Sequence, residues 1–278
     1  MKNTISRRWM ASALKYLALG FFALISIGPF IWIVLSSFKP LREIVSLPPT
    51  LWPQTWTVSN FVSAWNAVPY GRYLINSIMV STISTISVVF ISCLAAYSIV
   101  ILRSRLSRFI DVLVAIGIIM PTQITFIPMF QMAKSFGLVD SYAGLIMPYL
   151  STAFGVYMMT SFFRMLPYSL VDAARIDGLN ELGIITKIII PISRPGITTL
   201  VIFNFQQVWK DFFWPMLITN STTLRTVPIG ISAFTQVDSQ NQGWILAAAT
   251  ISIVPLFVMY MFFQKQFYES TAFSGMKL

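Results

Sequence analysis

The 278-residue sequence is poor in several residue types on which enzyme sites depend. It contains no histidine and one cysteine, and charged residues make up only 10% of it. Without histidine, zinc sites of the histidine type and Ser-His or Cys-His catalysis are excluded. The single Cys93 rules out an internal disulfide framework, and its apolar neighbours indicate a small buried side chain. No Gly-x-x-x-x-Gly-Lys-Ser/Thr loop occurs, so this sequence has no such loop to hold the phosphates of ATP.

Hydrophobic residues are abundant instead, at 56% of the chain, and aromatic residues make up 15%. An ordinary soluble domain carries charge on roughly a quarter of its residues, so we expect an all-α membrane protein. Apolar runs of roughly 20 residues have the length of a helix that crosses a bilayer. Such runs predict six transmembrane helices, at Ala13–Ser37, Tyr73–Leu102, Phe109–Met132, Ala143–Phe163, Ile197–Thr219 and Gly243–Phe263. The first run is too long for a signal-peptide core and no small-residue cleavage site follows it, so we expect a retained anchor.

Basic side chains gather on one side of these spans. They lie in the N-terminal arm, after the second span, between the fourth and fifth spans and in the tail: Lys2, Arg7, Arg8, Lys15, Arg103, Arg105, Arg108, Arg164, Arg175, Lys187, Arg194, Lys265 and Lys277. The positive-inside rule then places both termini, the segment 164–196 and the tail 264–278 in the cytoplasm. Topology thus explains the net charge of +10, and no nucleic-acid partner is expected.

The segment between the fourth and fifth spans has a local pattern of its own. Ser169 followed three residues later by Asp172 is a capping-box pattern, which predicts a short helix that begins near Leu170. Gly178 can take the left-handed conformation that ends a helix, and a second short helix is expected from Asn180. The pattern therefore predicts a compact helix-turn-helix between membrane spans. The alternative is an amphipathic loop that lies on the membrane surface.

In the same segment, Asp172-Ala173-Ala174 is followed by Gly178 and then by Ile188, Ile190 and Pro191. This run resembles the Glu-Ala-Ala (EAA) loop of the permease subunits of bacterial ABC importers, in the form of the carbohydrate-uptake permeases related to the inner maltose permeases. Two positions depart from the pattern, since Asp172 stands where Glu is usual and Ile190 where Leu is usual. The shorter aspartate keeps the charge and changes the reach of a salt bridge to an ATPase. The resemblance extends from about Gly28 to Lys277.

The resemblance implies a fold and a set of contact residues. The fold is that of an ABC importer type I permease, with a single transmembrane domain over residues 1–278 and a cytoplasmic coupling helix within 164–196. The implied contacts with an ATP-hydrolysing subunit are Asp172, Ala173, Ala174, Arg175, Asp177, Gly178 and Glu181. The small-residue ending of the chain, with Gly275 and Lys277, resembles tails that reach into the ATPase dimer.

The resemblance also implies an assembly in the cytoplasmic (inner) membrane, with both termini in the cytoplasm. The expected partners are a second, homologous permease that completes a heterodimer, two ATP-binding subunits, an extracytoplasmic solute-binding protein and membrane lipid. No cofactor is expected in this chain, because ATP and Mg would be bound by the partner ATPase. The chain itself is therefore not predicted to be an enzyme.

The fifth span has unusual polarity. Asn204, Gln207 and Asp211 recur at i, i+3 and i+7, so a continuous helix would place them on one face. A charge at mid-membrane costs about 2.5 kcal/mol or more, and such residues usually face a cavity or a paired group. One interpretation is a polar track for a hydroxyl-rich solute, with the Trp209 ring as a stacking surface. The alternative is that Lys210 and Asp211 pair with each other or with the partner subunit and hold the spans together.

The third span is interrupted at Met120-Pro121-Thr122-Gln123 and again at Pro128. Because proline frees backbone carbonyls, a break at membrane depth should face protein or a water-filled path. Gln123 is therefore a candidate pathway residue, and its alternative role is to satisfy the freed backbone.

Together these patterns predict a permease that moves a sugar or oligosaccharide by alternating access. A permease for a glycosyl phosphate or another anionic solute is less favoured, because the outward side has few cations. Two further hypotheses come from different classes of protein: an ion-coupled secondary transporter that uses Lys210 and Asp211, and a membrane scaffold. The helix-turn-helix between the spans favours the importer, because neither a secondary transporter nor a scaffold needs a docking segment.

Overall fold

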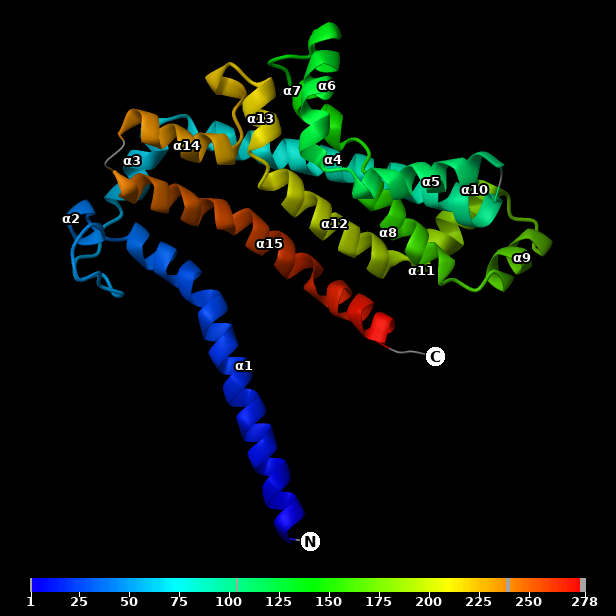
Figure 1. Cartoon of the computed structure of the whole chain (residues 1–278), viewed down its shortest axis with the longest axis horizontal. Coiled ribbons are helices and arrows are strands. Elements are labelled where there is room, and N and C mark those ends of the chain that lie inside the picture. Colours follow the sequence, from blue (N-terminus) through cyan, green and yellow to red (C-terminus); the bar gives the residue numbers. More distant parts are fainter. Residues whose placement is uncertain (1, 104, 239–240, 276–278) are drawn as a thin grey trace. The chain divides into compact units, whose positions relative to one another are not determined.

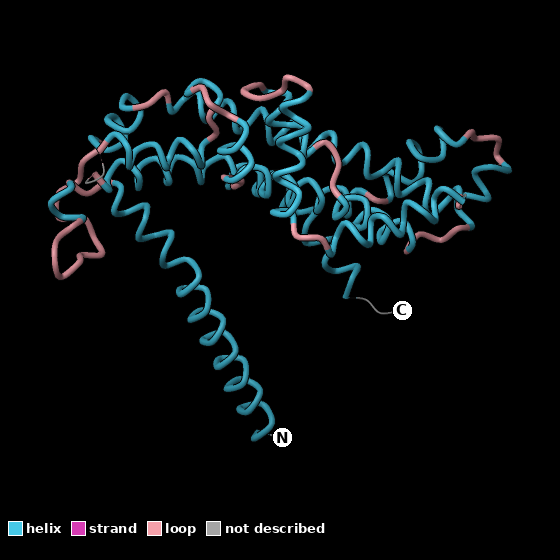
Figure 2. The backbone as a smooth tube through the Cα atoms, turned by 45° about the horizontal axis from the view of Figure 1, so that its top comes forward, coloured by secondary structure: helices cyan, strands magenta, loops and turns pink. Residues whose placement is uncertain are grey.

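The computed structural model describes residues 2–103, 105–238 and 241–275, and in these residues the chain forms helices and loops without a strand (Figure 2). This confirms the predicted all-α fold class. The helices are α1 (Lys2–Ser37), α2 (Leu41–Ile44), α3 (Ser59–Ala67), α4 (Tyr70–Tyr97), η1 (Ser98–Leu102), α5 (Arg105–Ile119), α6 (Thr122–Ser135), α7 (Tyr142–Ile146), η2 (Met147–Tyr149), α8 (Ala153–Arg164), α9 (Ser169–Ile176), α10 (Glu181–Ile184), η3 (Ile185–Ile189), α11 (Ile190–Ile192), α12 (Arg194–Trp209), α13 (Phe213–Ile218), η4 (Thr222–Leu224), α14 (Val227–Val237) and α15 (Gln242–Gly275). Of the short elements, η1 and η3 are π-helical, and η2 and η4 are 3-10 helices.

Several described helices have the length and composition of membrane spans. Three of them qualify alone: Leu14–Ser37, Tyr70–Leu102 and Gln242–Gln264. Three more candidates are pairs of helices bent at a short break: Leu106–Ile119 with Thr122–Ser135 (109°), Tyr142–Tyr149 with Ala153–Arg164 (42°), and Glu181–Ile192 with Arg194–Trp209 (76°). Counting each bent pair as one span gives up to six candidates, the predicted number, but the last pair begins at Glu181, inside the segment 164–196 that is predicted to lie in the cytoplasm.

The third predicted span is broken at the first of its two prolines. α5 ends at Ile119 and α6 begins at Thr122, and the two helices meet at 109°. Pro121 occupies the N-cap position of α6, where its extended backbone and missing N–H do not disturb the helix. The second expected interruption is wrong, because Pro128 lies inside α6. The helix continues through that ring with the loss of one backbone hydrogen bond.

The fifth predicted span is wrong as a single helix. α12 ends at Trp209 and α13 begins at Phe213. The Asp211 carboxylate accepts hydrogen bonds from the backbone N–H groups of Phe213 (2.9 Å) and Trp214 (3.4 Å). A side-chain acceptor of this kind satisfies free N–H groups at a helix start, so Asp211 favours a new helix at this point.

The described chain divides into two compact units, which are treated separately. Unit 1 is formed by the chain up to Val68 and by Ile231–Ser252. Unit 2 is formed by Pro69–Gly230 and by the chain from Ile253 onwards. The predicted coupling and pathway residues in the described chain all belong to unit 2.

In unit 1, two buried charged side chains hold the loop that follows α1. The Lys39 ammonium donates a hydrogen bond to the carbonyl of Thr50. The Glu43 carboxylate accepts from the backbone N–H groups of Gln54 (2.9 Å) and Thr55 (3.3 Å), and from the Thr50 hydroxyl (3.0 Å). These hydrogen bonds, that of Gln54 first, hold the pKa of Glu43 below its usual range. The loop is therefore organised around an ionised carboxylate.

In unit 2, α4, α8 and α12 lie side by side (Figure 1). Small residues let their backbones approach closely. A Cβ atom on Gly155 of α8 would lie 2.7 Å from the Ser92 hydroxyl of α4, and one on Gly196 of α12 would lie 2.6 Å from the Phe162 ring of α8. Close contact through small residues is the usual way in which membrane helices pack. This packing gives unit 2 a rigid centre from which the shorter helices extend.

Candidate functional site

Two short helices form the segment for which the sequence predicts the coupling residues. α9 begins at Ser169, next to the expected start at Leu170, and Figure 1 shows α9 and α10 at the opposite end of unit 2 from α13. The expected capping box is wrong, because Ser169 is already helical and the N-cap residue Tyr168 makes no side-chain cap. Asp172 nevertheless lies in the first turn, where the helix dipole favours negative charge.

The turn between α9 and α10 has the predicted geometry. Gly178 has a φ of +80°, the left-handed conformation that ends a helix. Asn180 occupies the N-cap of α10, and its side-chain oxygen accepts from the N–H of Gly183 at 2.8 Å. Both residues act locally, and this is why the sequence alone predicts them.

α9 has one face in the core and one face exposed. Val171 and Ala174 are buried in the same apolar core as Ile184 of α10. On the other side, Ile176 is 87% exposed. Leu182 at the start of α10 is also exposed, and it borders an apolar pocket within unit 2. The exposed residues Asp172, Ala173, Ile176, Asp177 and Leu182 are called here the α9–α10 face. Exposed apolar side chains beside carboxylates are typical of a surface that docks a partner.

A polar cluster joins this segment to the end of α4. Glu181 accepts hydrogen bonds from Arg175 Nε (3.1 Å) and from the hydroxyl of Tyr97. Arg175 also donates to the hydroxyl of Tyr168 (3.3 Å), and the guanidinium of Arg103 lies 4.7 Å from the centre of the Tyr168 ring. The hydrogen bond with Tyr168 and the Glu181 carboxylate raise the pKa of Arg175, so this guanidinium stays charged.

Tyr97, Arg103, Tyr168, Arg175 and Glu181 are called here the Tyr97–Glu181 cluster. Arg175 and Glu181 were predicted as ATPase contacts, and no site role was predicted for the other three. Tyr97 and Glu181 are 84 positions apart, so no helical period relates them. Tyr97 ends the second apolar run, whereas Glu181 lies in the polar segment after the fourth, so no signal in the sequence indicates that they meet.

The predicted pathway residues of the fifth span do not share one face. Asn204 is buried, and its amide donates to the hydroxyl of Thr85 in α4 at 3.2 Å. Gln207 is exposed on α12. Asp211 lies beyond the end of α12, so the expected common face with Asn204 and Gln207 is wrong. The helix break moves Asp211 out of register with the other two.

Asp211 and Trp209 have partners within this chain. Besides its hydrogen bonds at the start of α13, Asp211 accepts from the hydroxyl of Tyr149. Lys210 is exposed, and among the described residues it forms no ion pair with Asp211. The Trp209 ring is buried and stacks on Phe205, with ring centres 5.8 Å apart. The ring face covered by Phe205 is therefore not open to a solute.

The remaining predicted residues lie apart from these groups. Gln123 is exposed in the first turn of α6. Gly275 is the last residue of α15, and Lys277 lies outside the described residues.

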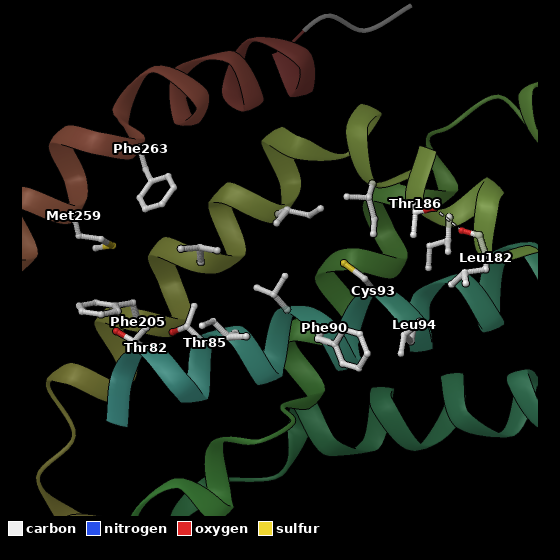
Figure 3. A pocket seen from close by; sticks show the side chains of 16 residues that line it. Thr82, Thr85, Phe90, Cys93, Leu94, Leu182, Thr186, Phe205, Met259 and Phe263 are labelled. Carbon is white, nitrogen blue, oxygen red and sulfur yellow. Dashed lines mark hydrogen bonds between the residues drawn. The ribbon is translucent and has the colours of Figure 1, made fainter. Parts of the chain in front are cut away.

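A pocket of about 640 Å³ lies within unit 2 between α4, α10, η3, α12 and α15 (Figure 3). Its labelled walls are mostly apolar, and the labelled hydroxyl side chains belong to Thr82, Thr85 and Thr186. A hydroxyl-rich solute needs hydrogen-bond partners when it leaves water, and these walls supply few. Asn204 and Gln207 do not line this pocket. It therefore does not have the chemistry expected of a sugar site.

The chain is similar to one family and to individual transport proteins. The family described as binding-protein-dependent transport system inner membrane component matches residues 88–271. The diacetylchitobiose uptake system permease protein NgcG of Streptomyces coelicolor is 30% identical, over 92% of this chain and 85% of that protein. The sulfoquinovosyl glycerol transport system permease protein SmoH of Agrobacterium fabrum is 30% identical, over 98% of this chain and 96% of that protein.

The fold is also found among solved structures. One of them is described as a bacterial ABC transporter involved in the import of the acidic polysaccharide alginate. Its matching chain has a TM-score of 0.80 at 22% identity, with 93% of this chain and 96% of that chain covered.

Proposed function

Because this chain belongs to the family of binding-protein-dependent transport system inner membrane components, we propose that it is the permease subunit of an ATP-driven importer that moves a sugar or oligosaccharide by alternating access. Family membership makes it a multi-pass membrane protein and a transport component. The observation that carries the proposal is the α9–α10 face, where Ile176 is 87% exposed at the end of a closely packed unit.

The chemistry of this face fits an ATP-hydrolysing subunit as its partner. Burying a large aliphatic side chain such as Ile176 contributes about 1.5–3 kcal/mol, so it can anchor a docked surface. The carboxylates of Asp172 and Asp177 can meet basic side chains of the partner, which gives orientation. Ala174 is buried and supports the packing of α9 instead of the contact. ATP and Mg would be bound in the partner.

The proposed assembly also contains a second, homologous permease, two ATP-binding subunits and an extracytoplasmic solute-binding protein. Gln206 and Gln207 are exposed on the apolar helix α12. Amide side chains are costly against lipid, so this face of α12 is expected to meet a second permease or a water-filled path between the two. The distribution of basic side chains supports termini on the cytoplasmic side, where α9 and α10 would meet the ATPase.

The names of the relatives support a saccharide as the solute. They name diacetylchitobiose and sulfoquinovosyl glycerol, and the solved transporter is described as involved in the import of alginate. A second candidate is an anionic saccharide or glycosyl phosphate. It is favoured by the acidic alginate and by Lys210, an exposed cation that directly follows α12. An ion-coupled transporter is less well supported, because Asp211 is already bound by Tyr149 and by the backbone of α13.

The first test is co-purification of the ATPase with variants of this chain. Ile176→Glu places a charge on the α9–α10 face, and Leu47→Glu changes a 92% exposed residue in the loop of unit 1 as the matched control. We expect the ATPase to co-purify with the native chain and with Leu47→Glu, and to be lost with Ile176→Glu. Hydrolysis of ATP by the reconstituted complex, stimulated by a binding protein loaded from a panel of neutral and anionic sugars, then identifies the solute.

Two results would contradict the proposal. Equal recovery of the ATPase with Ile176→Glu would remove the α9–α10 face as the docking surface. Solute uptake that persists without ATP and stops when ion gradients collapse would exclude an ATP-driven importer. Stronger stimulation by an anionic sugar than by any neutral one would select the second candidate.

A further inference from the structure

We propose that Tyr97 is a positioning residue that locks α10 to the end of α4, so that a displacement of the α9–α10 face is transmitted into α4. The proposal rests on the proposed function, because it needs a partner that moves this face. Tyr97 lies outside the α9–α10 face and inside unit 2. Its role would be to pass on a motion that begins elsewhere.

The link between Tyr97 and Glu181 joins two elements that are distant in the sequence. Tyr97 is the last residue of α4 and is 5% exposed, so its ring is held in the core and its hydroxyl has little freedom. The hydroxyl donates to Oε2 of Glu181, the first residue of α10. A hydrogen bond to a carboxylate is stronger than one between neutral groups, and it is directional.

The same carboxylate holds α9. Arg175 Nη2 lies 3.0 Å from Glu181 Oε1, and Arg175 Nε donates to the same oxygen at 3.1 Å. Arg175 also donates to Tyr168, whose hydroxyl donates to the carbonyl of Ile101 in η1 at 3.5 Å. One set of polar contacts therefore joins α9 and α10 to the end of α4. A force on either short helix reaches Glu181.

Apolar packing alone would not fix this register. Ile184, Ile185 and Ile189 are buried against the core that also contains Tyr97. Apolar contact resists separation but has no direction, so packed helices can slide on one another. The hydrogen bond of Tyr97 supplies the missing direction. Its removal should leave the packing in place and loosen the coupling.

Two π-helical segments lie directly beside this link. η1 begins at Ser98, immediately after Tyr97, and η3 begins at Ile185, immediately after α10. A π-helix is rare, and it occurs frequently at functional sites. The two elements that continue the chain from α4 and from α10, η1 and η3, are both π-helical. The hydrogen bond between Tyr97 and Glu181 joins α4 to α10 directly, without η1 or η3 between them.

The test compares Tyr97→Phe with Tyr157→Phe. Tyr157 lies in α8, and among the described residues its hydroxyl has no hydrogen-bond partner, so it controls for loss of a hydroxyl group. The readout is solute imported per ATP hydrolysed in proteoliposomes, with diacetylchitobiose on its binding protein as the first probe and the stimulating sugar of the panel thereafter. Loss of a hydrogen bond to a charged group predicts a decrease on the order of tenfold for Tyr97→Phe. Tyr157→Phe should match the native chain.

If Tyr97→Phe does not fold, a second pair of variants tests the same hydrogen bond from the side of Glu181. Glu181→Gln keeps an acceptor for Tyr97 and loses the ion pair with Arg175, whereas Glu181→Ala loses both. We expect more solute per ATP with Glu181→Gln than with Glu181→Ala. Co-purification of the ATPase with Tyr97→Phe is a further readout, because the α9–α10 face is unchanged in that variant.

Each contrary result has a definite meaning. An unchanged ratio in Tyr97→Phe, or an equal decrease in Tyr157→Phe, would overturn the inference. Loss of the ATPase from Tyr97→Phe would show a structural role only, and would overturn it as well. If the native chain itself recruits no ATPase, the proposed function fails, and this inference fails with it.

Discussion

At the scale of single residues, Asp140 shows how one carboxylate can hold two loops together. It lies between α6 and α7 with a φ of +58°. Its Oδ1 accepts from the backbone N–H groups of Asn220 and Ser221, each at 2.9 Å, and from the Ser221 hydroxyl at 3.0 Å. These hydrogen bonds, that of the Ser221 backbone first, hold the pKa of Asp140 below its ordinary value of 3.8. The ionised form is therefore the one that the fold stabilises.

The sign of this pKa shift predicts a dependence of stability on pH. Because the folded pKa is lowered, the stabilisation is fully present above pH 3.8 and is lost as the pH falls through the folded pKa. Asp140→Asn keeps an acceptor and tolerates the positive φ, but it has no charge to lose. We expect a lower thermal midpoint than the native chain at neutral pH, and a difference that narrows below pH 3.8. Thermal unfolding of the purified complex across that range is the measurement, and a constant difference would contradict the account.

At the scale of elements, the contact between α7 and the preceding loop leaves no room for a side chain. A Cβ atom on Gly144 would lie 2.1 Å from the carbonyl oxygen of Leu138 and 3.1 Å from the Ile218 side chain. A backbone carbonyl cannot turn away as the end of a flexible side chain can. The loop that contains Asp140 would therefore have to move.

Gly144→Ala is accordingly expected to destabilise the fold, by about 1–3 kcal/mol as for other overpacked positions. Gly20→Ala is the matched control, because no atom lies within 4 Å of a Cβ at that position in α1. The thermal midpoint should fall for Gly144→Ala and stay level or rise for Gly20→Ala, since alanine favours a helix. Equal midpoints for the two variants would show that the loop adjusts without strain.

The sequence predicted features that depend on residues close together in the chain, and it missed features that depend on distant residues. Gly178 and Asn180 set the turn between α9 and α10 through their own backbone and side chain, and both were predicted. The end of α12 was missed, because the apolar pattern resumes at Phe212 directly after two charged residues, so the hydropathy of the whole run does not register the break. The carboxylate that accepts from the first N–H groups of α13 belongs to Asp211, which also accepts a hydrogen bond from Tyr149, 62 positions away.

Helical periodicity also could not predict which of these side chains are exposed and which are covered by other helices. A helical pattern predicts that Asn204 and Gln207 share a side of α12, but the hydroxyl that binds Asn204 belongs to α4. The Trp209 ring was predicted as a stacking surface, and Phe205 covers one of its faces. Tyr97 had no local signal at all. These residues depend on neighbours that only the packed helices bring into contact.

At the scale of the whole molecule, two glycines with a similar left-handed backbone make it possible to separate effects on stability from effects on coupling. Gly137 has a φ of +66° and Gly178 a φ of +80°, and at neither does any atom lie within 4 Å of a Cβ. An alanine is therefore strained at both positions by its backbone alone, at roughly 1–2 kcal/mol. Gly137 follows α6, whereas Gly178 sets the angle between α9 and α10.

Gly137→Ala and Gly178→Ala should thus lower the thermal midpoint of the complex by similar amounts and differ in transport. Strain at Gly178 changes the direction in which α10 leaves α9, and so moves Glu181 away from the hydroxyl of Tyr97 as well as altering the α9–α10 face. We expect Gly178→Ala to import less solute per ATP hydrolysed, and Gly137→Ala to keep the native ratio. An equal loss of that ratio in both variants would mean that coupling follows overall stability. Native coupling in a destabilised Gly178→Ala would show that the turn between α9 and α10 does not transmit the motion.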